Sequence, residues 1–489
     1  MKKFHLVIYG CQMNYSDAAR IKAVLNNCGR QHVDTRDEAN VVIIDTCSVR
    51  QKSEDKVWWL LKEIRPDQKV WCTGCMIGHN LNLKKAKATA SKKLTMGNFL
   101  GNVESNEPTI VGLEPLTDEL RKTLNPSDEI LYVNHSFDPL RRTMHDSFPS
   151  VELFFRINDL GFLPFVMRKL GYQVSPDIDV VNEYTGIIPH SANMLFAENT
   201  KTAYVPISTG CSQFCAYCIV PYARGLEKNR DKEEVMKEVE AQVTGGAEEI
   251  VLLGQIVNKH PDFDEIVRRT CETPGVKRVR YTSPYPTFYS DELLHLHETM
   301  ENLCPHIHMP LQSGSNAVLK KMFRGYTAEQ FKEFVDKIRA LDRPISITSD
   351  VIVGFCDETE KDFLETIELV RYAKFDLIYM GIYSPRPWTY AVKKYEDNVS
   401  RAVKKERWHR LNEVLKEVSA ANNQIEIGTT KTVMVKEVTD DRITGYSENM
   451  KQVIVEREAW KKEKEEVKPG EFLKTKISSI KSFTLYGEV

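Results

Sequence analysis

Cys211-Ser-Gln-Phe-Cys215-Ala-Tyr-Cys218 carries three thiols within eight residues, at spacings of four and three. The apolar, β-prone stretch 202–208 precedes these cysteines, and a helical pattern begins near Asp231. The thiols are therefore expected in a loop at the carboxyl end of a strand, where α/β folds place their ligands. This stretch predicts an α/β fold with a ligand site at a strand end.

The chemistry of three close thiols favours an iron–sulfur cluster. Three thiolates can ligate three irons of a 4Fe–4S cluster and leave the fourth iron open for a substrate. Zinc usually takes four protein ligands, and the sequence has no fourth cysteine or histidine near this stretch. A disulfide would leave one thiol unpaired. Three unrelated buried cysteines are the remaining alternative, which the tight spacing disfavours.

The spacing Cys-x3-Cys-x-aromatic-Cys, with Tyr217 at the aromatic position, resembles the signature of the radical S-adenosylmethionine (SAM) enzymes. The resemblance implies that the open iron chelates the amino and carboxylate groups of SAM. Reduction would then split the sulfonium and give a 5′-deoxyadenosyl radical. On this reading the chemistry belongs to the cofactors, and no side chain is expected to act as a catalytic acid or base.

Length and charge bound the class of protein. The 489 residues are too many for one ordinary core, so about two to four domains are expected. A net charge of −2 gives no overall basic signature, so any RNA contact would be a local patch. The apolar run at the amino terminus is too short for a signal peptide, and no stretch is long enough to cross a bilayer. Eleven cysteines, an odd number, favour metal or redox use in a reducing cytoplasm over a full disulfide framework.

Residues 1–100 alternate strand and helix patterns and predict a βαβαβ unit with a parallel sheet. The expected strands are 4–9, 41–45 and 69–73, and the expected helices are 16–27, capped by Ser16, and 53–64. One cysteine follows each strand: Cys11, Cys47 and Cys75. Since parallel strands end at one edge, these thiols should converge and indicate a second metal cluster. The alternative is that small cysteines merely suit tight turns.

Short motifs around these three cysteines resemble those of the methylthiotransferase amino-terminal domain. They are Gly10-Cys-Gln-Met-Asn14, Asp45-Thr-Cys-Ser-Val-Arg50 and Thr73-Gly-Cys-Met76. The resemblance implies that Cys11, Cys47 and Cys75 bind an auxiliary 4Fe–4S cluster. Cys72 lies inside the third predicted strand, and a core role is expected for it.

Residues 101–200 form a connecting segment with weak helical patterns at 116–124 and 162–170. Methylthiotransferases usually have a shorter connection here, so the resemblance implies that about half of this segment is an insertion. An ordered surface elaboration is favoured.

Residues 201–398 read as repeated βα units, the expected radical SAM core. Six strands are predicted, at 202–208, 249–253, 278–282, 306–311, 346–353 and 377–383. Helices are predicted between them, for example at 232–243 and 358–373. Six strands rather than eight predict an open, partial (β/α)6 barrel whose side mouth admits a macromolecular substrate. Loops at the carboxyl ends of the strands should carry the chemistry.

Further motifs of the family fall in those loops. Leu252-Leu-Gly-Gln255, Pro310-Leu-Gln-Ser-Gly-Ser315, Asp350-Val-Ile-Val-Gly-Phe355 and Tyr383-Ser-Pro-Arg-Pro387 follow the second, fourth, fifth and sixth strands. The resemblance implies that the cofactor-binding residues are Tyr217, Gly254, Gln255, Gln312, Ser313, Asp350, Gly354 and Arg386. At Gly354, the missing side chain would let backbone approach the SAM adenosine. The chain departs from the family pattern at Ser212–Phe214, Ile256, Cys356–Asp357 and Trp388, but all six cluster cysteines are present.

The carboxyl-terminal part has two segments, a linker helix at 399–427 and short strands at 428–489. The helix is basic, which suits either a solvated face or a phosphate-contacting face; its cations are Arg401, Lys404, Lys405, Arg407 and Arg410. Strands at 432–438, 442–446, 452–456, 472–480 and 483–485 predict a small five-stranded barrel. It resembles the TRAM domain, a tRNA-binding barrel of the OB type. Lys431, Lys436, Arg442 and Lys451 are its candidate RNA-facing cluster.

Taken end to end except for the insertion, the chain resembles the radical SAM methylthiotransferases. The resemblance implies methylthiolation at C2 of N6-isopentenyladenosine next to the anticodon of tRNA. An aromatic C–H there is too inert for side-chain acid–base catalysis, so radical chemistry at the Cys211/Cys215/Cys218 cluster is expected. The Cys11/Cys47/Cys75 cluster would carry the sulfur, with two SAM molecules used per turnover. A cytoplasmic monomer that binds the tRNA anticodon stem-loop and takes electrons from flavodoxin or ferredoxin is expected.

Three alternatives stay open at this point. Two share the enzyme class: methylthiolation of N6-threonylcarbamoyladenosine in tRNA, or of an aspartate in a ribosomal protein. The motifs Gly10-Cys-Gln-Met-Asn14 and Ser384-Pro-Arg-Pro387 favour the isopentenyl substrate. The third alternative is a non-catalytic iron–sulfur RNA-binding protein, against which the intact triad with Tyr217 argues.

Overall fold

The computed structural model describes residues 3–48, 51–77, 144, 146–155, 157–175, 178, 201–460 and 467–489. The chain divides into two compact units. Unit 1 comprises residues 1–195, 209–213 and 219–228, and unit 2 comprises residues 196–208, 214–218 and 229–489. Cys211 therefore belongs to unit 1, and Cys215 and Cys218 belong to unit 2. The helix expected at 116–124 lies outside the described residues.

Unit 1 contains a five-stranded parallel sheet with the order β2-β1-β3-β4-β5. Its strands are β1 (Lys3–Ile8), β2 (Gln31–His32), β3 (Val41–Thr46), β4 (Lys69–Gly74) and β5 (Val151–Phe154). The three predicted strands are confirmed as β1, β3 and β4. Its helical elements are α1 (Gln12–Asn27), η1 (Arg36–Glu38), α2 (Gln51–Glu63), η3 (Ile157–Phe162), α7 (Leu163–Lys169) and α8 (Val220–Arg224).

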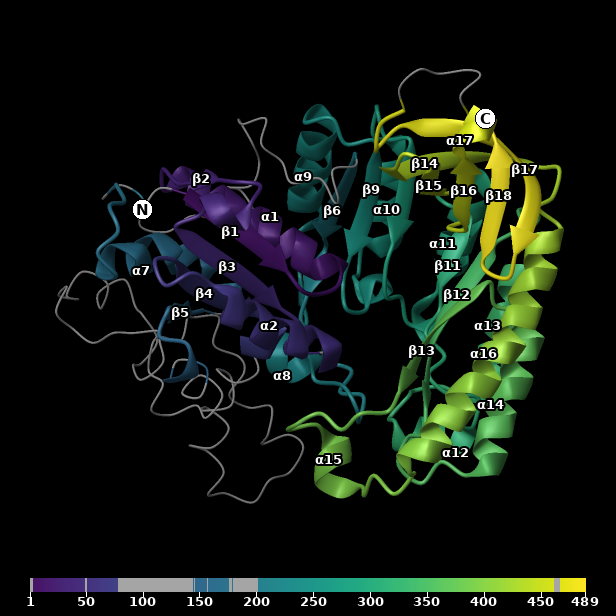
Figure 1. The fold of residues 1–489 in the computed structure, drawn as a ribbon. Coiled ribbons are helices and arrows are strands. Elements are labelled where there is room, and N and C mark those ends of the chain that lie inside the picture. Colours follow the sequence, from purple (N-terminus) through teal and green to yellow (C-terminus); the bar gives the residue numbers. More distant parts are fainter. Residues whose placement is uncertain are drawn as a thin grey trace. The chain divides into compact units, whose positions relative to one another are not determined.

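Both faces of this sheet are covered, as is usual for parallel sheets. Side chains alternate along β3, so Ile43 packs with Ile21 of α1 on one face and Ile44 packs with Val57 of α2 on the other. The two layers can be followed in Figure 1. Cys72 packs in the apolar layer that contains Ile44 and Val57 and has no exposed surface, which confirms its core position.

The predicted cap of the first helix is wrong. α1 begins at Gln12, with Cys11 at the cap position, and Ser16 is a buried interior residue. The side chain of Asn14 accepts a hydrogen bond from the Cys11 backbone N–H at 3.0 Å. This bond satisfies a donor at the helix start and moves the start four residues upstream of the expected cap.

Part of the connecting segment is core rather than surface elaboration. β5 pairs with β4, and Phe155, Leu160 and Leu163 are buried against α1 and β1. The Trp71 Nε1–H donates to the Glu152 carboxylate at 3.0 Å. A four-residue strand flanked by turn formers gives too short an alternation to be recognised from sequence. The helix expected at 162–170 is confirmed as α7.

Unit 2 contains six parallel strands, all at predicted positions. They are β6 (Thr202–Pro206), β9 (Glu249–Leu253), β10 (Arg278–Tyr281), β11 (His306–His308), β12 (Ser346–Val353) and β13 (Leu377–Ile382). They form two three-stranded sheets, β10-β9-β6 and β11-β12-β13. A parallel bridge between Val279 and Leu303 joins β10 to the segment just before β11. The strands therefore follow one another in chain order.

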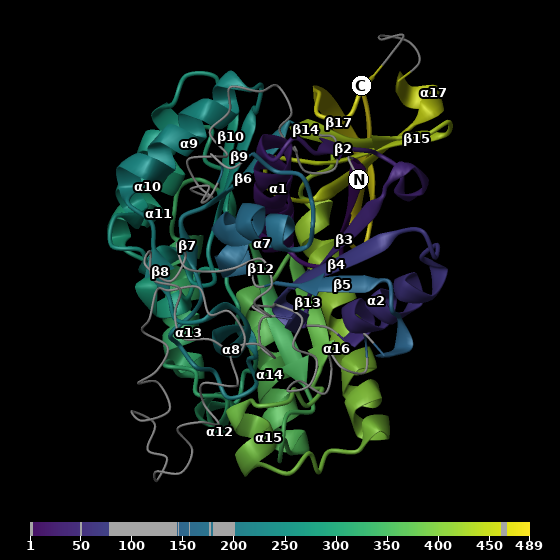
Figure 2. The ribbon, with the colours of Figure 1, turned by 90° about the vertical axis from the view of Figure 1, so that its left-hand side faces the viewer.

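Helices cover one face of these strands, as Figure 2 shows for α9, α10 and α11 beside β6, β9 and β10. Alternate residues such as Val205, Leu252 and Val279 point into this apolar layer. Glu249 and Arg280 alternate with these residues along β9 and β10, so they lie on the opposite face, where Arg280 Nε donates to Glu249 Oε1 at 2.8 Å. The helical elements before β13 are α9 (Lys232–Thr244), η5 (Val257–Lys259), α10 (Phe263–Glu272), η6 (Pro286–Phe288), α11 (Asp291–Thr299), α12 (Asn316–Lys321), α13 (Ala328–Arg339) and α14 (Glu360–Ala373). Short strands β7 (Ser208–Thr209) and β8 (Lys228–Asn229) flank the cysteine loop and α8 in the chain.

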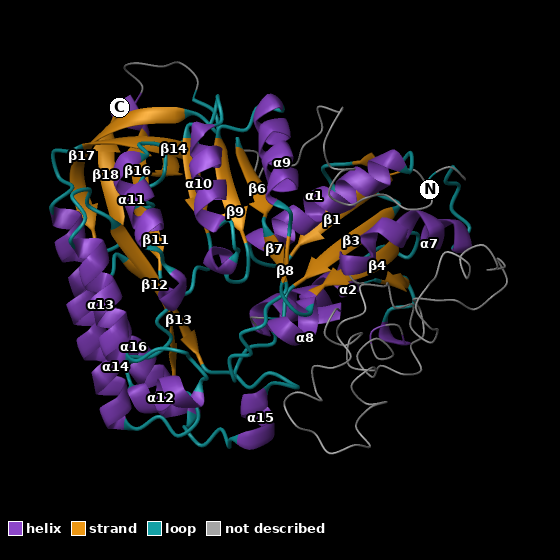
Figure 3. Cartoon of the chain, turned by 180° about the vertical axis from the view of Figure 1, so that it is seen from behind, coloured by secondary structure: helices purple, strands orange, loops and turns teal. Residues whose placement is uncertain are grey.

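The carboxyl-terminal strands close into a five-stranded barrel with the order β14-β15-β16-β18-β17, as predicted. Its elements are β14 (Thr430–Val438), β15 (Arg442–Tyr446), β16 (Gln452–Glu456), α17 (Arg457–Trp460), β17 (Phe472–Lys481) and β18 (Thr484–Glu488). Val433, Val435 and Leu485 fill its interior. α15 (Tyr390–Lys394) and the long α16 (Arg401–Gln424) precede it, and α16 runs beside α14 and β13 (Figure 3).

Two of the basic residues of α16 are internal. Arg407 Nη1 lies 2.8 Å from the Glu358 carboxylate, and Lys404 Nζ donates to the Tyr383 carbonyl at 3.3 Å. Both side chains are buried. A phosphate-contacting role is therefore wrong for these two, because their charges are used inside unit 2.

The small barrel packs at the amino-terminal ends of the parallel strands. Arg278, the first residue of β10, donates to the Thr432 carbonyl at 2.7 Å and to the Tyr446 carbonyl at 3.2 Å. Lys451 Nζ lies 2.9 Å from the carboxylate of Asp376, just before β13. Buried Lys451 and partly buried Lys431 are paired with Glu426, so their expected place in an RNA-facing cluster is wrong. Within the described residues no helix is long and apolar enough to span a bilayer.

Candidate cluster sites

Cys11, Cys47 and Cys75 come from three neighbouring strands of unit 1. β1, β3 and β4 are adjacent and parallel, and each of the three cysteines follows the carboxyl end of one of them. Within the described residues none of the three is in a disulfide; Cys11 is exposed, and Cys47 and Cys75 are buried. Burial raises the pKa of the Cys75 thiol to about 12; the Arg224 guanidinium opposes this rise, and the charges of Cys47 and Cys11 add to it. The sheet therefore places the predicted auxiliary ligands within electrostatic reach of one another.

Gly74 makes the turn that sets Cys75 apart from β4. Its φ is +90°, and an added Cβ would lie 2.3 Å from the Thr46 carbonyl oxygen. Only glycine fits this backbone approach without strain. The chain can thus turn directly after β4 and present Cys75 beside the end of β3.

Asn14 ties two of the cysteine loops together. Its side-chain oxygen accepts from Cys11 N–H, and its Nδ2 donates to Asp45 Oδ1 at 2.9 Å. Asp45 is fully buried two residues before Cys47. Burial and the neighbouring Asp17 raise the pKa of Asp45 well above its ordinary value. Asn14 thereby fixes the start of α1 to the end of β3.

Arg224 is a site residue that was not expected from the sequence. It ends α8, is buried, and donates from Nε to Cys75 Sγ at 3.2 Å. Its Nη2 donates to Asp17 Oδ2 at 2.7 Å. The available sequence signal was an arginine six residues after Cys218, in Pro221-Tyr-Ala-Arg224-Gly.

The central cysteines lie in a loop whose two parts fold with different units. In unit 1, Cys211 is buried and its N–H donates to the Gly225 carbonyl at 3.1 Å. In unit 2, Cys218 N–H donates to the Cys215 carbonyl at 2.9 Å, which forms a tight turn. Arg324, also unexpected, donates from Nη1 to Cys215 Sγ at 3.3 Å. The Arg324 guanidinium is held by the rings of Tyr285 and Tyr326, at 4.5 and 5.1 Å.

The predicted cofactor-binding residues of unit 2 lie at three places: after β9, after β13 and around β12. Gly254 and Gln255 directly follow β9, and Arg386 is buried in the loop after β13. The others lie around β12: Gln312 N–H donates to the Asp350 carbonyl at 2.8 Å, and Ser313 Oγ lies 3.3 Å from Thr366 Oγ1. Tyr217 meets Phe355 edge to face at 6.5 Å.

Gly354 has a packing explanation within unit 2. Its φ is +70°, and an added Cβ would lie 2.3 Å from Cγ of Lys404. The side chain of Lys404 therefore occupies the space that the missing Cβ leaves. A contact of Gly354 with SAM stays a prediction.

A polar network on β11 and β12 was also not predicted from the sequence. His308 Nε2 lies 3.0 Å from Asp350 Oδ2, and its Nδ1 lies 3.0 Å from Thr348 Oγ1. His306 Nε2 reaches the same hydroxyl at 2.8 Å, and burial keeps the pKa of His306 well below its ordinary value. The alternation His306-Ile-His308 in a strand was the signal that both imidazoles share one face.

The donor set suits a cluster better than a single ion. Among the described residues, no three His, Cys, Asp or Glu side chains converge tightly enough to hold one metal ion. A 4Fe–4S cluster bonds each thiolate to a different iron, so its ligands need not meet at one point. Cys11, Cys47 and Cys75 lie at one sheet edge and are in no disulfide, so their thiols fit such a group.

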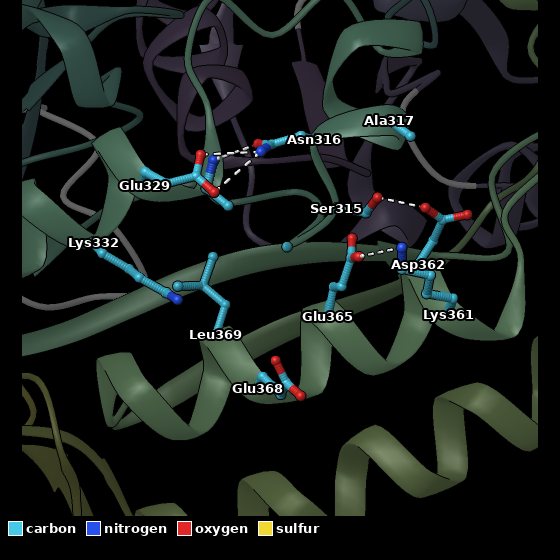
Figure 4. Close-up of a pocket in the computed structure, with 12 residues that line it drawn as sticks. Ser315, Asn316, Ala317, Glu329, Lys332, Lys361, Asp362, Glu365, Glu368 and Leu369 are labelled. Atoms are coloured by element: carbon cyan, nitrogen blue, oxygen red, sulfur yellow. Dashed lines mark hydrogen bonds and ion pairs between the residues drawn. The ribbon is translucent and has the colours of Figure 1, made fainter.

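One pocket of about 380 Å³ in unit 2 lies between α13 and α14 and is lined by none of the predicted site residues, although its Ser315 donates from its N–H to Ser313 Oγ (Figure 4). In the lining of this pocket, Ser315 Oγ donates to Asp362 Oδ1, and Asn316 Nδ2 donates to Glu329 Oε2. The pocket contains four carboxylates and none of the predicted site residues. It is lined by Gly314, Ser315, Asn316, Ala317, Ala328, Glu329, Lys332, Lys361, Asp362, Glu365, Glu368 and Leu369. It is therefore not part of the candidate site.

Two parts of the chain match known protein families. Residues 205–370 match the Radical SAM superfamily, and residues 3–96 match the family described as Uncharacterized protein family UPF0004. The first match begins at the end of β6 and spans the central triad and the strands from β9 to β12. A radical SAM domain implies a 4Fe–4S cluster and SAM as cofactors.

Similarity to curated proteins extends over the whole chain. The tRNA-2-methylthio-N(6)-dimethylallyladenosine synthase of Dictyoglomus thermophilum is 30% identical over 100% of this chain and 99% of its own length. The protein of the same name from Fusobacterium nucleatum is 31% identical over 100% of both chains. That of Bacillus velezensis is 32% identical over 99% of this chain and 85% of its own length. The chain belongs to the family of tRNA-2-methylthio-N(6)-dimethylallyladenosine synthases.

Proposed function

We propose that this chain methylthiolates C2 of N6-isopentenyladenosine (dimethylallyladenosine) next to the anticodon of tRNA. The observation that carries the proposal is the pair of cysteine triads, one at the carboxyl edge of the parallel sheet of unit 1 and one in the central loop. The relatives that align end to end with the chain are named for this product. Two triads suit a reaction that needs both a radical source and a sulfur carrier.

The first part of the proposal concerns the cofactors. Cys211, Cys215 and Cys218 would hold one 4Fe–4S cluster, and Cys11, Cys47 and Cys75 a second. With SAM bound, the first cluster supplies the radical chemistry that an inert aromatic C–H requires. Arg324 would hold Cys215 through its hydrogen bond to the sulfur, and Asn14 would keep the loops of Cys11 and Cys47 in register.

The second part concerns SAM. The residues proposed to bind it are Tyr217, Gly254, Gln255, Gln312, Ser313, Asp350, Gly354 and Arg386. They follow strands of unit 2, whose six parallel strands we interpret as an open (β/α)6 barrel with its chemistry at the carboxyl ends. Two SAM molecules would be used per turnover, one as radical source and one as methyl donor.

The third part concerns the tRNA. The closed barrel β14–β18 has the size and strand number of an OB-like TRAM domain, and we propose that it binds the tRNA anticodon stem-loop. Lys436 and Arg442 are exposed on it, and Lys436 lies 5.8 Å above the ring of Tyr446. Such cation and aromatic pairs suit contacts with phosphates and bases. A cytoplasmic monomer that takes electrons from flavodoxin or ferredoxin completes the proposal.

Mass spectrometry of tRNA nucleosides tests the substrate. Cells with and without the gene should differ in 2-methylthio-N6-isopentenyladenosine and not in the threonylcarbamoyl analogue. In parallel, the reduced protein should form 5′-deoxyadenosine with an isopentenyladenosine stem-loop. A change confined to the threonylcarbamoyl nucleoside, or to a ribosomal protein, would assign the chain to one of those substrates instead. Absence of any 5′-deoxyadenosine would support a non-catalytic RNA-binding protein.

A further inference from the structure

We infer that Arg224 is a positioning residue for the auxiliary cluster, and that its hydrogen bond to the Cys75 sulfur raises the reduction potential of that cluster. The inference rests on the proposed binding of this cluster by Cys11, Cys47 and Cys75. It goes further by assigning a role to a residue that lies just after the central triad in the chain.

The guanidinium of Arg224 is held between a sulfur and a carboxylate. Nε donates to Cys75 Sγ at 3.2 Å, and Nη2 donates to Asp17 Oδ2 at 2.7 Å. Arg224, Asp17 and Cys75 all have 5% or less of their surface exposed. Because the guanidinium is a rigid plane, its bond to Asp17 fixes the direction of the Nε–H toward the sulfur. The contact with Cys75 is therefore built into the fold.

The anchor of this arrangement is Asp17 on α1. Its other oxygen accepts from Arg20 Nη1 at 3.2 Å, so two arginines share one buried carboxylate. Arg224 is the one whose bond to the Cys75 sulfur is defined, and Arg20 lies on α1 itself, three residues after Asp17. Arg20 is thus a natural comparison for separating the bond to sulfur from the charge of the buried group.

A donor at a cluster sulfur affects the electron affinity of the cluster. Reduction adds negative charge to the cluster and its thiolates, and a cationic N–H donor stabilises that charge. Hydrogen bonds to the sulfurs are among the factors that set iron–sulfur potentials. In a buried, low-dielectric position the interaction is stronger than it would be in water. Removal of Arg224 should therefore make the cluster harder to reduce.

The placement of α8 gives the bond a second consequence. α8 begins two residues after Cys218, and its last residue is the one that contacts Cys75. The same hydrogen bond therefore ties the chain that leaves the central triad to the sheet edge of the auxiliary site. Within unit 1, the Arg224 side chain thus connects the segment after the radical SAM motif to the loop that carries Cys75.

The test uses the full chain with Cys211, Cys215 and Cys218 replaced by alanine, so that only the auxiliary cluster is present. In this background, Asp17→Asn/Arg224→Gln removes the sulfur contact without leaving a buried carboxylate unpaired. Asp17→Asn/Arg20→Gln removes one negative and one positive charge as well, and keeps Arg224, whose Nη2 can still donate to the amide oxygen of Asn at this position. A redox titration followed by electron paramagnetic resonance measures the potential of each. The first variant should be at least tenfold harder to reduce than the second, about 59 mV for a one-electron couple.

Iron content separates the possible failures. Both double variants should bind about four irons per chain, as one 4Fe–4S cluster requires. Equal potentials in the two variants would overturn the role of Arg224 and leave the cluster proposal standing. An alanine background that binds no iron would overturn the auxiliary cluster and this inference with it. If Asp17→Asn/Arg224→Gln does not fold, Arg224→Lys keeps the charge beside Asp17 but loses the planar fork, and an unchanged potential in it would overturn the inference.

Discussion

Gly74 separates two cysteines that have different environments. Cys72 is inside β4 with no exposed surface, and burial raises the pKa of its thiol to about 12. Cys75 comes after the turn at Gly74 and touches Arg224. Position in the strand, rather than the chemistry of the thiol, distinguishes packing from ligation here.

The first prediction concerns these two thiols. Cys75→Ala should lose the auxiliary cluster and methylthiolation but retain reductive cleavage of SAM at the other cluster. Cys72→Ala should keep both clusters and lose about 1 kcal/mol of stability, as expected for a small truncation in a core. Iron analysis and 5′-deoxyadenosine formation measure the outcome. Iron loss from Cys72→Ala alone would contradict the assignment of Cys75.

The second prediction concerns acid stability. Burial lowers the pKa of His297 to about 3, from an ordinary 6.5. Below pH 6.5 His297 is protonated in the unfolded chain but stays neutral in the folded chain. The contribution of neutral His297 to the free energy of unfolding is therefore complete above this pH and decreases as the pH falls. The slope is about 1.4 kcal/mol per pH unit down to about pH 3.

His297→Gln tests this directly, because glutamine can keep the hydrogen bond to the Tyr281 hydroxyl, 2.7 Å away, without titrating. The drop in melting temperature of the metal-free protein between pH 7 and pH 5 should be smaller in the variant than in the parent chain. Equal drops would show that His297 does not contribute to acid sensitivity.

At the scale of elements, the small barrel is anchored by buried charges. Lys451 Nζ lies 2.9 Å from Asp376 and 3.3 Å from Glu426, with its side chain 7% exposed. Removing the whole barrel would leave Asp376 without this partner, so deletion would confound stability with RNA binding. Single substitutions separate the two roles more cleanly.

The third prediction is a pair of lysine substitutions. Lys451→Met should destabilise the chain by about 3–5 kcal/mol, because it leaves the buried Asp376 carboxylate without its lysine partner, whereas Glu426 keeps Lys431. Lys436→Met, on the exposed face of β14, should change stability by less than about 0.5 kcal/mol and weaken tRNA binding, with a salt slope lower by about 1. Thermal unfolding and binding at several salt concentrations measure both effects. Normal tRNA affinity in the stable Lys436→Met variant would remove this residue from the proposed RNA face.

At the scale of the whole molecule, the two triads are predicted to act as independent sites. The fourth prediction is that replacing Cys211, Cys215 and Cys218 together with alanine leaves about four irons per chain and abolishes SAM cleavage. The converse variant, lacking Cys11, Cys47 and Cys75, should retain SAM cleavage without methylthiolation. Loss of all iron from either triple variant would contradict separate clusters.

The sequence alone determined the features that depend on local pattern. The six βα strands, the five barrel strands and the sheet edge that gathers Cys11, Cys47 and Cys75 all follow from periodicity and from the rule that parallel strands end together. These signals lie within short stretches of sequence, so they can be read without knowing which distant residues each strand contacts.

Only the tertiary structure decided which polar side chains act together. Arg224 meets Cys75 from 149 positions away in sequence, and Lys451 meets Asp376 from a different domain of unit 2. β5 was likewise recognisable only through its pairing with β4. A charge in a sequence suits solvent, RNA or a buried partner equally well, and the choice depends on which opposite charge the fold brings within a few ångströms.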